Sequence, residues 1–317
     1  MTWSIRPATT ETADLAAIAR IVSTVTPDDP TSVDEMRWSD ATYPGTLRLL
    51  AEDGGRAVGV ATAGRIYMYP PDYPELWGSV HVVPDARRRG IGSALLRAIS
   101  DHARAVGKAT LQVTASEGRP EGIAFLRAHG FTELERARMM RLDLAGMQPP
   151  AIDPPTDIRI ASLEERPDLV PGVHAVAVEA FADIPGGDEP IAPGDLAEFR
   201  ARDVDRASIP PGGFVVATET GSDRVVGYAS LIFIPGSTTV AWHDMTAVIR
   251  AWRGRGLAGA LKRATIGWAI DHGLEALETG TDEANAPMRA VNLKLGYRLL
   301  PDEVTMRGLA VGAETSV

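Results

Sequence analysis

Apolar positions along this chain follow two spacings, one typical of helices and one typical of strands. Leu15, Ile18 and Ile21 recur at three-residue intervals and predict a helix over residues 12–25. Further helices are predicted at 90–106 and 120–128, and strands at 3–6, 46–52, 57–67, 76–83, 109–114, 131–134 and 139–144. The first half therefore alternates strands with helices.

The second half repeats this order. Its pattern predicts strands at 157–161, 213–218, 225–233, 240–249 and 276–280, two closing strands, and helices at 172–181, 193–204, 257–272 and 286–295. Strands interleaved with helices predict an α/β fold, more closely an α+β arrangement in which a mixed sheet is covered by helices on both faces.

A proline-rich segment separates the two halves. Residues 145–155 contain four prolines in eleven positions, which continue neither a helix nor a central strand. We therefore expect an N-terminal domain at 1–144, a linker at 145–155 and a C-terminal domain at 156–317.

The two halves share sequence motifs at a constant offset. RRRGIGSAL at 87–95 aligns with RGRGLAGAL at 253–261, and FLRAHGF at 125–131 aligns with VNLKLGY at 291–297; both pairs are 166 residues apart. Two motifs at one offset indicate an ancient duplication.

The first motif of each pair has the chemistry of an anion site. An apolar strand runs into Arg-x-x-Gly-x-(Gly/Ala) and then into an apolar-periodic helix. A helix start offers free backbone N–H groups and a positive dipole end, and a glycine lets a phosphate approach the backbone. Neither loop has the lysine of a Walker A motif or the acidic partner of a dinucleotide fold. A solvated basic loop is the plain alternative, and the repetition disfavours it.

These segments resemble a known family. VVPDARRRGIG at 82–92 and VIRAWRGRGLA at 248–258 resemble the acyl-CoA-binding motif of GNAT-type N-acetyltransferases, and AHGF and KLGY, ending at 131 and 297, resemble that family's closing segment. The resemblance implies two tandem GNAT-like acyl-CoA N-acyltransferase domains, with acetyl-CoA (coenzyme A) as co-substrate. The implied coenzyme-binding residues are Val82, Val83, Arg87, Arg88, Arg89, Gly90, Ile91, Gly92 and Ser93 in the first copy, and Val248, Ile249, Arg253, Gly254, Arg255, Gly256, Leu257 and Ala258 in the second.

The resemblance also assigns roles. It implies that the backbone N–H groups of Val82 and Val248 polarise the acetyl carbonyl. Asn285 corresponds to a family asparagine that contacts the pantetheine arm, although asparagine is equally a good helix cap. Many family members carry a tyrosine four residues before the closing glycine, as the acid for the leaving thiolate. Those positions are Leu126 and Asn292 here, so another residue or solvent must supply that proton.

A base is needed to deprotonate the amine acceptor. His243 and Asp244 lie on the strand that enters the second loop. Alternation along a strand lets only one of them face the site, and Asp244, an even number of residues from Val248, is favoured. Both could instead be ordinary surface positions. The pair Asp282-Glu283 could attract a cationic amine or simply be solvated.

Composition narrows the possible partners. The chain has 42 acidic and 32 basic residues, a net charge of −10, no cysteine, and only three lysines: Lys108, Lys262 and Lys294. This acidity argues against nucleic acid and anionic membranes as partners. The histidines show no metal-ligand spacing, so we expect no metal. No leader or 18-residue apolar run is present, so we expect a cytoplasmic location.

The resulting hypothesis is an N-acetyltransferase that moves acetyl directly from acetyl-CoA to the amine of a small molecule. The second domain is the expected catalytic half, and the first would bind the coenzyme structurally or vestigially. One specific possibility is a tandem member that acetylates a cysteinyl amine. A non-catalytic acyl-CoA-binding or sensing protein is the alternative.

Overall fold

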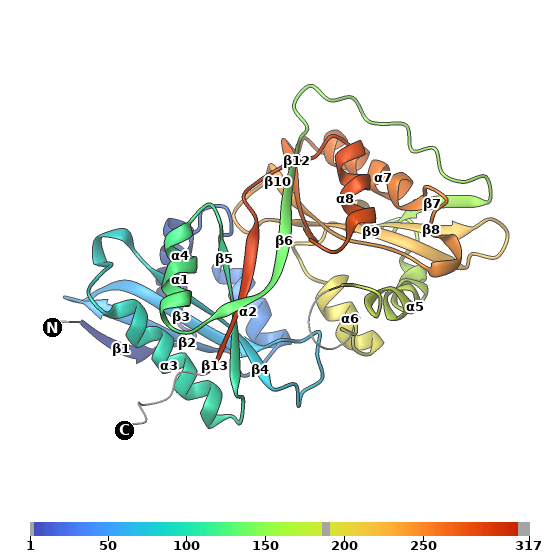
Figure 1. Ribbon diagram of the computed structural model, residues 1–317. Coiled ribbons are helices and arrows are strands. Elements are labelled where there is room, and N and C mark those ends of the chain that lie inside the picture. The colour runs from blue at the N-terminus through green and yellow to red at the C-terminus, as the bar shows by residue number, and fades with distance from the viewer. Residues whose placement is uncertain (1–2, 186–190, 310–317) are drawn as a thin grey trace. The chain divides into compact units, whose positions relative to one another are not determined.

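A computed structural model describes residues 3–185 and 191–309. It divides into two compact units, Met1–Arg136 with Asp302–Val317, and Ala137–Pro301 (Figure 1). Each unit is a mixed sheet with helices on both faces, which confirms the predicted fold class.

The sheet of the first unit has the order β1-β2-β3-β4-β5-β13. All neighbours are antiparallel except β4 and β5, which are parallel. Its strands are β1 (Trp3–Pro7), β2 (Leu47–Asp53), β3 (Arg56–Arg65), β4 (Glu75–Val82), β5 (Thr110–Ser116) and β13 (Glu303–Leu309); its helices are α1 (Thr12–Val25), α2 (Val33–Thr42), α3 (Ile91–Ala105) and α4 (Pro120–Ala128), with the 3-10 turn η1 (Pro84–Ala86) before α3.

Apolar side chains place these helices on opposite faces. Leu15 and Ile18 of α1 and Met36 of α2 pack with Leu50 and Val60 of the sheet. On the other face, α3 and α4 join the larger cluster, which includes Leu95, Ile99, Leu111, Ile123 and Val304. Helix α2 was not predicted, because Met36 is its one fully buried residue and it shows no apolar stripe.

The second unit repeats the plan with the order β7-β8-β9-β10-β11-β6. Its elements are β7 (Ile158–Ser162), η2 (Pro167–Leu169), α5 (Val170–Phe181), α6 (Leu196–Asp203), η3 (Pro211–Gly213), β8 (Val215–Glu219), β9 (Val225–Phe233), β10 (Val240–Val248), η4 (Arg250–Trp252), α7 (Leu257–Asp271), β11 (Ala276–Asp282), α8 (Ala286–Lys294) and the short β12 (Arg298–Leu299). Helices α3 and α7 are 15 residues each, and α3, β5 and α4 match α7, β11 and α8 at the offset of 166 that the motifs show.

Strand β6 (Thr132–Asp143) runs from the first unit into the second. The sequence had predicted two strands here, 131–134 and 139–144, but the intervening residues Glu135–Arg138 contain no turn-forming residue and the strand continues. Residues Ala137–Asp143 pair with β11 in the second unit. In the first unit, β13 from the end of the chain pairs with β5 instead.

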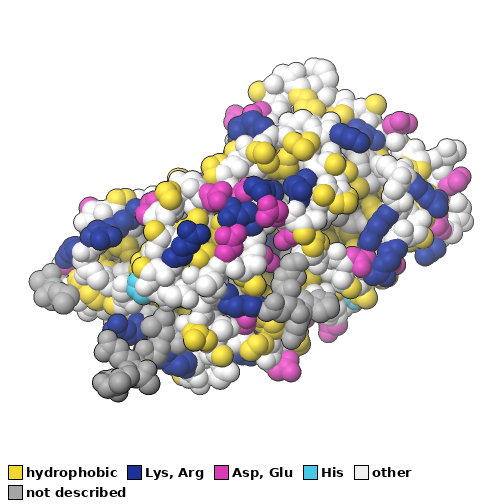
Figure 2. Space-filling view, viewed as in Figure 1, with side chains coloured by type: hydrophobic (Ala, Val, Ile, Leu, Met, Phe, Trp, Pro, Cys, Tyr) yellow, Lys and Arg dark blue, Asp and Glu magenta, His cyan; other side chains and the backbone are white. Residues whose placement is uncertain are grey.

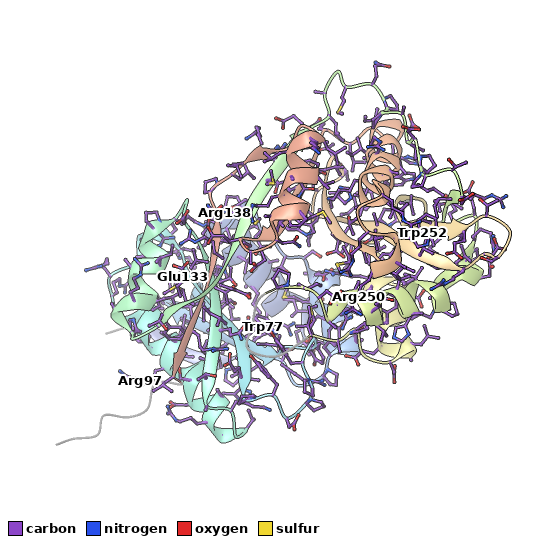
Figure 3. The ribbon with its side chains drawn as sticks, turned by 45° about the vertical axis from the view of Figure 1, so that its right-hand side comes forward. Trp77, Arg97, Glu133, Arg138, Arg250 and Trp252 are labelled. Carbon is purple, nitrogen blue, oxygen red and sulfur yellow. The ribbon has the colours of Figure 1, made fainter. Side chains whose placement is uncertain are left out.

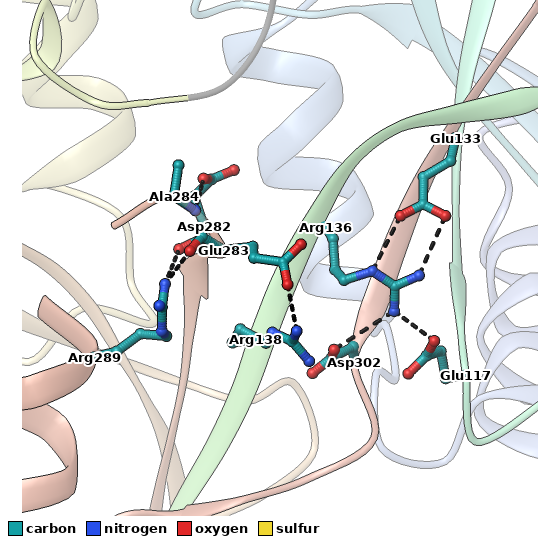
Figure 4. Close-up of polar contacts among 9 residues, drawn as sticks. All are labelled: Glu117, Glu133, Arg136, Arg138, Asp282, Glu283, Ala284, Arg289 and Asp302. Atoms are coloured by element: carbon teal, nitrogen blue, oxygen red, sulfur yellow. Dashed lines mark hydrogen bonds and ion pairs between the residues drawn. The ribbon is translucent and has the colours of Figure 1, made fainter. Parts of the chain in front are cut away.

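The compact units therefore differ from the expected domains 1–144 and 156–317. Strand β13 lies in the first unit and the end of β6 in the second, because each sheet is completed by a strand distant in sequence. Ion pairs accompany each part of β6: Arg136 contacts Glu133, Glu117 and Asp302 in the first unit, and Arg138 contacts Glu283 in the second (Figure 4). The proline-rich segment has no regular structure, and Arg263 of α7 donates to the Ile152 carbonyl within it.

Charges of both signs are mixed on the surface. On the face in Figure 2, Lys and Arg side chains lie among Asp and Glu side chains, without a large patch of one sign. No helix in the described part of the chain is long and apolar enough to span a membrane.

Candidate functional site

In each unit the two parallel strands separate before the motif loop. Strand β4 pairs with β5 only over Glu75–Gly78, and β10 pairs with β11 only over Val240–Trp242. Beyond these residues, β4 continues to Val82 and β10 to Val248, past the last residues that pair with the parallel neighbour. Each unit thus has a wedge between two strands that leads to the start of a helix.

Backbone groups at the strand ends point into these wedges. The N–H groups of Val83 and Ile249 donate to Val58 and Val226 on the antiparallel neighbour, 3.0 Å away in each case. Because N–H directions alternate along a strand, those of Val82 and Val248 point the opposite way, toward β5 and β11. This direction fits a donor to a thioester carbonyl held in the wedge.

The loops after these strands have matching backbones. Gly90 and Gly256 precede α3 and α7 in the left-handed conformation, each with a φ of 83°, and neither helix start has a side-chain cap. The first N–H groups of both helices therefore remain available to an anion. Ile91 and Leu257, the first helical residues, are buried and fix the helix starts in the core. Each loop thus presents free helix N–H donors, the kind of group that binds an anion.

Small residues follow in the first turn of each helix. A Cβ on Gly92 would lie 3.4 Å from the Phe125 ring, an ordinary contact distance, so the first turn of α3 packs beside α4. Ser93 contacts His129 Nε2 through its Oγ at 2.9 Å, and Ala258 stands at the position of Gly92 in the second unit.

Several arginines of the two loops have partners within the chain, and their coenzyme contacts stay a prediction. Arg87 and Arg253, which occupy matching positions, donate from Nε to the carbonyls of Val82 and Val248 at 3.0 and 2.9 Å. They hold the loop against the strand end. Arg89 pairs with Asp53 at 2.7 Å. Only part of the arginine set is thus directed outward, with Arg88 exposed at the tip of the first loop.

In the second unit, Asp183 fixes the loop. It pairs with Arg250 at 2.6 Å and with Arg253 at 2.7 Å. Arg255 lies over the Trp252 ring, 4.7 Å from its centroid. Arg250 and Trp252 belong to the short η4 turn between β10 and α7 (Figure 3).

Arg88 has a backbone conformation that favours glycine, with a φ of 62°, and the matching residue of the second unit is Gly254, with a φ of 74°. We expect Arg88→Gly to raise the free energy of unfolding by about 1 kcal/mol, because a non-glycine residue pays roughly that amount in this region. Chemical denaturation of the two proteins measures the difference. Equal or lower stability of Arg88→Gly would contradict this expectation.

His243 lies in the core of the second unit. Its ring is fully buried, with Nδ1 2.8 Å from the Tyr297 hydroxyl and Nε2 3.1 Å from Thr265 Oγ1. Burial lowers the pKa of His243 well below its usual value, with a smaller effect from the charge of Lys262. A neutral ring with both nitrogens engaged is a structural group, so the geometry does not support the expected role of His243 as a base.

Asp244 points away from His243, toward Ser230, whose Oγ lies 3.5 Å from its carboxylate. A β-bulge between His243 and Thr246 interrupts the strict alternation on which the sequence argument relied. Burial, with a smaller contribution from the charge of Asp203, raises the pKa of Asp244 to about 6, although hydrogen bonds to the carboxylate and the charge of Arg206 lower it. A carboxylate with this pKa is suited to take a proton near neutral pH.

Asn285 caps α8, since its side chain accepts a hydrogen bond from the Met288 N–H at 3.3 Å. A coenzyme contact by the Asn285 side chain stays a prediction. Asn292 is fully buried and donates to Thr281 Oγ1 at 3.2 Å, while Leu126 is buried in the first unit. Glu283 pairs with Arg138, and Asp282 accepts from the Ala284 N–H, so local partners engage both carboxylates.

Lys262 is a candidate functional residue that the sequence pattern did not predict. Lys262 is buried on α7, with its Nζ 5.5 Å from the centroid of the Tyr297 ring. Its position in an apolar helix face was the available signal, because an isolated lysine there is unusual. Among the described residues, no group of three or more His, Asp or Glu side chains is placed to hold a metal ion.

Comparisons with known proteins agree with this geometry. The model of the acetyltransferase (GNAT) family matches residues 15–131 and 178–297. A mycothiol acetyltransferase of Nocardiopsis dassonvillei is 28% identical over 92% of this chain and 90% of its own length. One of Parafrankia sp. is 27% identical over 95% and 97%. A tandem GNAT protein of the clavulanic acid biosynthesis pathway has the same fold, with a TM-score of 0.81 and 22% identity over 98% of this chain and 100% of its own.

Two family matches cover most of the chain, and each includes one wedge and one motif loop. The family uses acetyl-CoA, and both loops have the uncapped helix start that its pyrophosphate needs. The chain belongs to the acetyltransferase (GNAT) family, in which it is a tandem, acetyl-CoA-dependent N-acetyltransferase.

Proposed function

We propose that the second unit carries the catalytic site and transfers acetyl to the primary amine of a small molecule. The observation that best supports this proposal is the position of Asp244, a carboxylate with a raised pKa on the strand that borders the second wedge. The corresponding stretch of the first unit, Gly78–Val82, contains no carboxylate. Strand β10 is also one residue longer than β4, and its extra residue falls at the bulge beside Asp244.

In this proposal each group has one task. Acetyl-CoA supplies the activated acetyl group when bound. The first N–H groups of α7, behind Gly256, would hold its pyrophosphate, and the Val248 N–H would hydrogen-bond the acetyl oxygen. Asp244 takes the proton from the amine on its carboxylate, which leaves the nitrogen lone pair free to attack. The first unit keeps the same loop for binding, without a base.

The test is an acetyl-transfer assay with a panel of amines. The rate of transfer is measured as the rate at which free CoA thiol appears. We expect at least one primary amine to raise release at least tenfold above acetyl-CoA hydrolysis, with a matching acetylated product by mass spectrometry. A panel of cysteinyl, diamino-acid, polyamine and aminoglycoside amines without any such acceptor would overturn the proposal of a small-molecule amine.

The relatives favour one acceptor within this class. Proteins named mycothiol acetyltransferase align with this chain over nearly its whole length. A cysteinyl amine, the acceptor of mycothiol synthase, is therefore our second, narrower candidate. It requires that kcat/KM for a cysteinyl amine exceed that for every other panel member. A higher value for another amine would reject it and leave the broader proposal intact.

A further inference from the structure

Lys262 is a buried cation that the fold does not need. Its side chain is 1% exposed, and the matching residue of the first unit is Leu96, which is buried in the apolar core. A leucine at that position packs well under the first sheet, so packing alone does not require a lysine. Fully buried lysines are rare unless they are paired, which suggests a role for this one.

The surroundings of Lys262 are polar but do not pair it. Its Nζ lies 5.5 Å from the centroid of the Tyr297 ring. Asp244 and His243 on β10 are the other titratable groups that act on its charge or respond to it. Among the described residues, none accepts a hydrogen bond from Nζ or lies within ion-pair distance of it. No protein group in the described part of the chain therefore fixes the ammonium by a hydrogen bond or an ion pair.

A second buried group near Tyr297 is also incompletely paired. Asn292 donates to Thr281, but its Oδ1 has no partner. Asn292 and Tyr297 lie in and just after α8, while Lys262 lies on α7 and Thr281 on β11, the far strand of the wedge. Asn292 stands where the resemblance places the tyrosine that protonates the thiolate, and Asn292 cannot provide that proton. Lys262, on α7, reaches the ring of Tyr297, five residues after Asn292.

We propose that the Lys262 ammonium donates the proton to the CoA sulfur when the acetyl group leaves it. This inference rests on the proposed catalytic role of the second unit. The C–N bond to the acceptor forms as the C–S bond breaks, and the sulfur takes the electron pair of that bond and a proton from Nζ. Asp244 meanwhile takes the proton that the neutral acceptor amine loses as it becomes the amide; an acceptor that arrives as an ammonium ion has first released one proton through Asp244 to solvent. Return of the proton on Asp244 to the neutral Lys262 amine restores both groups, with no other reactant needed.

The ionisation of Lys262 suits this task. Burial lowers its pKa to about 7, and the negative charge of Asp244 opposes that shift. A group that both gains and loses a proton near neutral pH can serve as an acid and be reset within each cycle.

Lys262→Leu tests the proposal, since Leu96 shows that this side chain fits the same place in the repeat. The control is Lys294→Leu, which removes an exposed lysine from α8 of the same unit. The first measurement is the ultraviolet absorbance of the thiolate in bound CoA as a function of pH. We expect the pKa of the bound thiol to be at least one unit lower in the intact chain and in Lys294→Leu than in Lys262→Leu.

The second measurement is kcat with an accepted amine, which should fall by about 10²-fold or more in Lys262→Leu. A thiol titration that is the same in both variants, or a kcat within threefold of the intact chain, would show that Lys262 is not the acid. If Lys262→Leu does not fold, Lys262→Met keeps the length of the side chain and serves instead. The thiol titration needs no acceptor, so its result is separate from any failure of the proposed function.

Discussion

Asp244→Asn should lower kcat for acetyl transfer by about 10²–10⁴-fold, because the amine acceptor then loses its base. Binding of acetyl-CoA should be unchanged, since the loop that we propose holds its pyrophosphate begins beyond β10. Steady-state rates and calorimetric titration of the two proteins measure these quantities. A variant within threefold of the intact chain would show that another group takes the proton.

The pH profile gives an independent view of the same residue. Burial raises the pKa of Asp244 to about 6, so kcat/KM should rise with pH through about 6 as the carboxylate ionises, and Asp244→Asn should lack this limb. Asp203→Asn is the matched control. The charge of Asp203 raises the pKa of Asp244, so its removal should move the limb to lower pH and retain kcat.

The unfolding temperature of Asp244→Asn shows whether a loss of activity in this variant comes from the missing base or from a damaged fold. The folded state favours protonated Asp244, because its pKa is raised above the unfolded value of 3.8. The stability that this preference contributes is present at low pH and declines as pH rises through about 6. Asp244→Asn should therefore unfold at a temperature no lower than the intact chain at pH 8. A lower unfolding temperature for the variant would mean that its loss of kcat comes from a damaged fold.

Met306→Ala should lower the free energy of unfolding of the first unit by about 2–5 kcal/mol. Met306 and Val304 are fully buried in β13, which brings them to the core of α3, β5 and α4 from the far end of the chain. Hydrogen exchange of the β5 amides reports this loss, because β13 pairs with β5 over seven residues, Thr110–Ser116.

Leu309→Ala is the control for this strand. Leu309 is 75% exposed, and its truncation should change stability by no more than about 0.5 kcal/mol. If Met306→Ala left exchange in β5 unaltered, β13 would not be an integral strand of the first unit.

Local sequence signals predicted the elements that position the site. Helices α3 and α7 begin directly after Gly90 and Gly256, because a periodic apolar face follows a residue that adopts a positive φ. Helix α2 was missed because it has no stripe, although Ser32 accepts from the Glu35 N–H, and Ser-x-x-Glu is a known start signal.

The sequence pattern could not predict which strands, distant along the chain, pair in the sheets. The alternation of β6 does not show that its second half pairs with β11, and nothing in β13 identifies β5 as its neighbour. The direction of the side chains on β10 could not be predicted from the sequence either. The β-bulge after His243 cannot be read from the strand pattern, and it decides which of two adjacent groups faces the core.

The measurement that tests the central claim most directly is calorimetric titration of acetyl-CoA into the intact chain, Gly256→Trp and Gly273→Trp. Gly256 and Gly273 stand at opposite ends of α7 with φ values of 83° and 72°, so the two variants share the same backbone strain. The account predicts that Gly256→Trp loses one acetyl-CoA site and that Gly273→Trp retains it. An intact chain that does not bind acetyl-CoA, or equal binding by all three proteins, would contradict it.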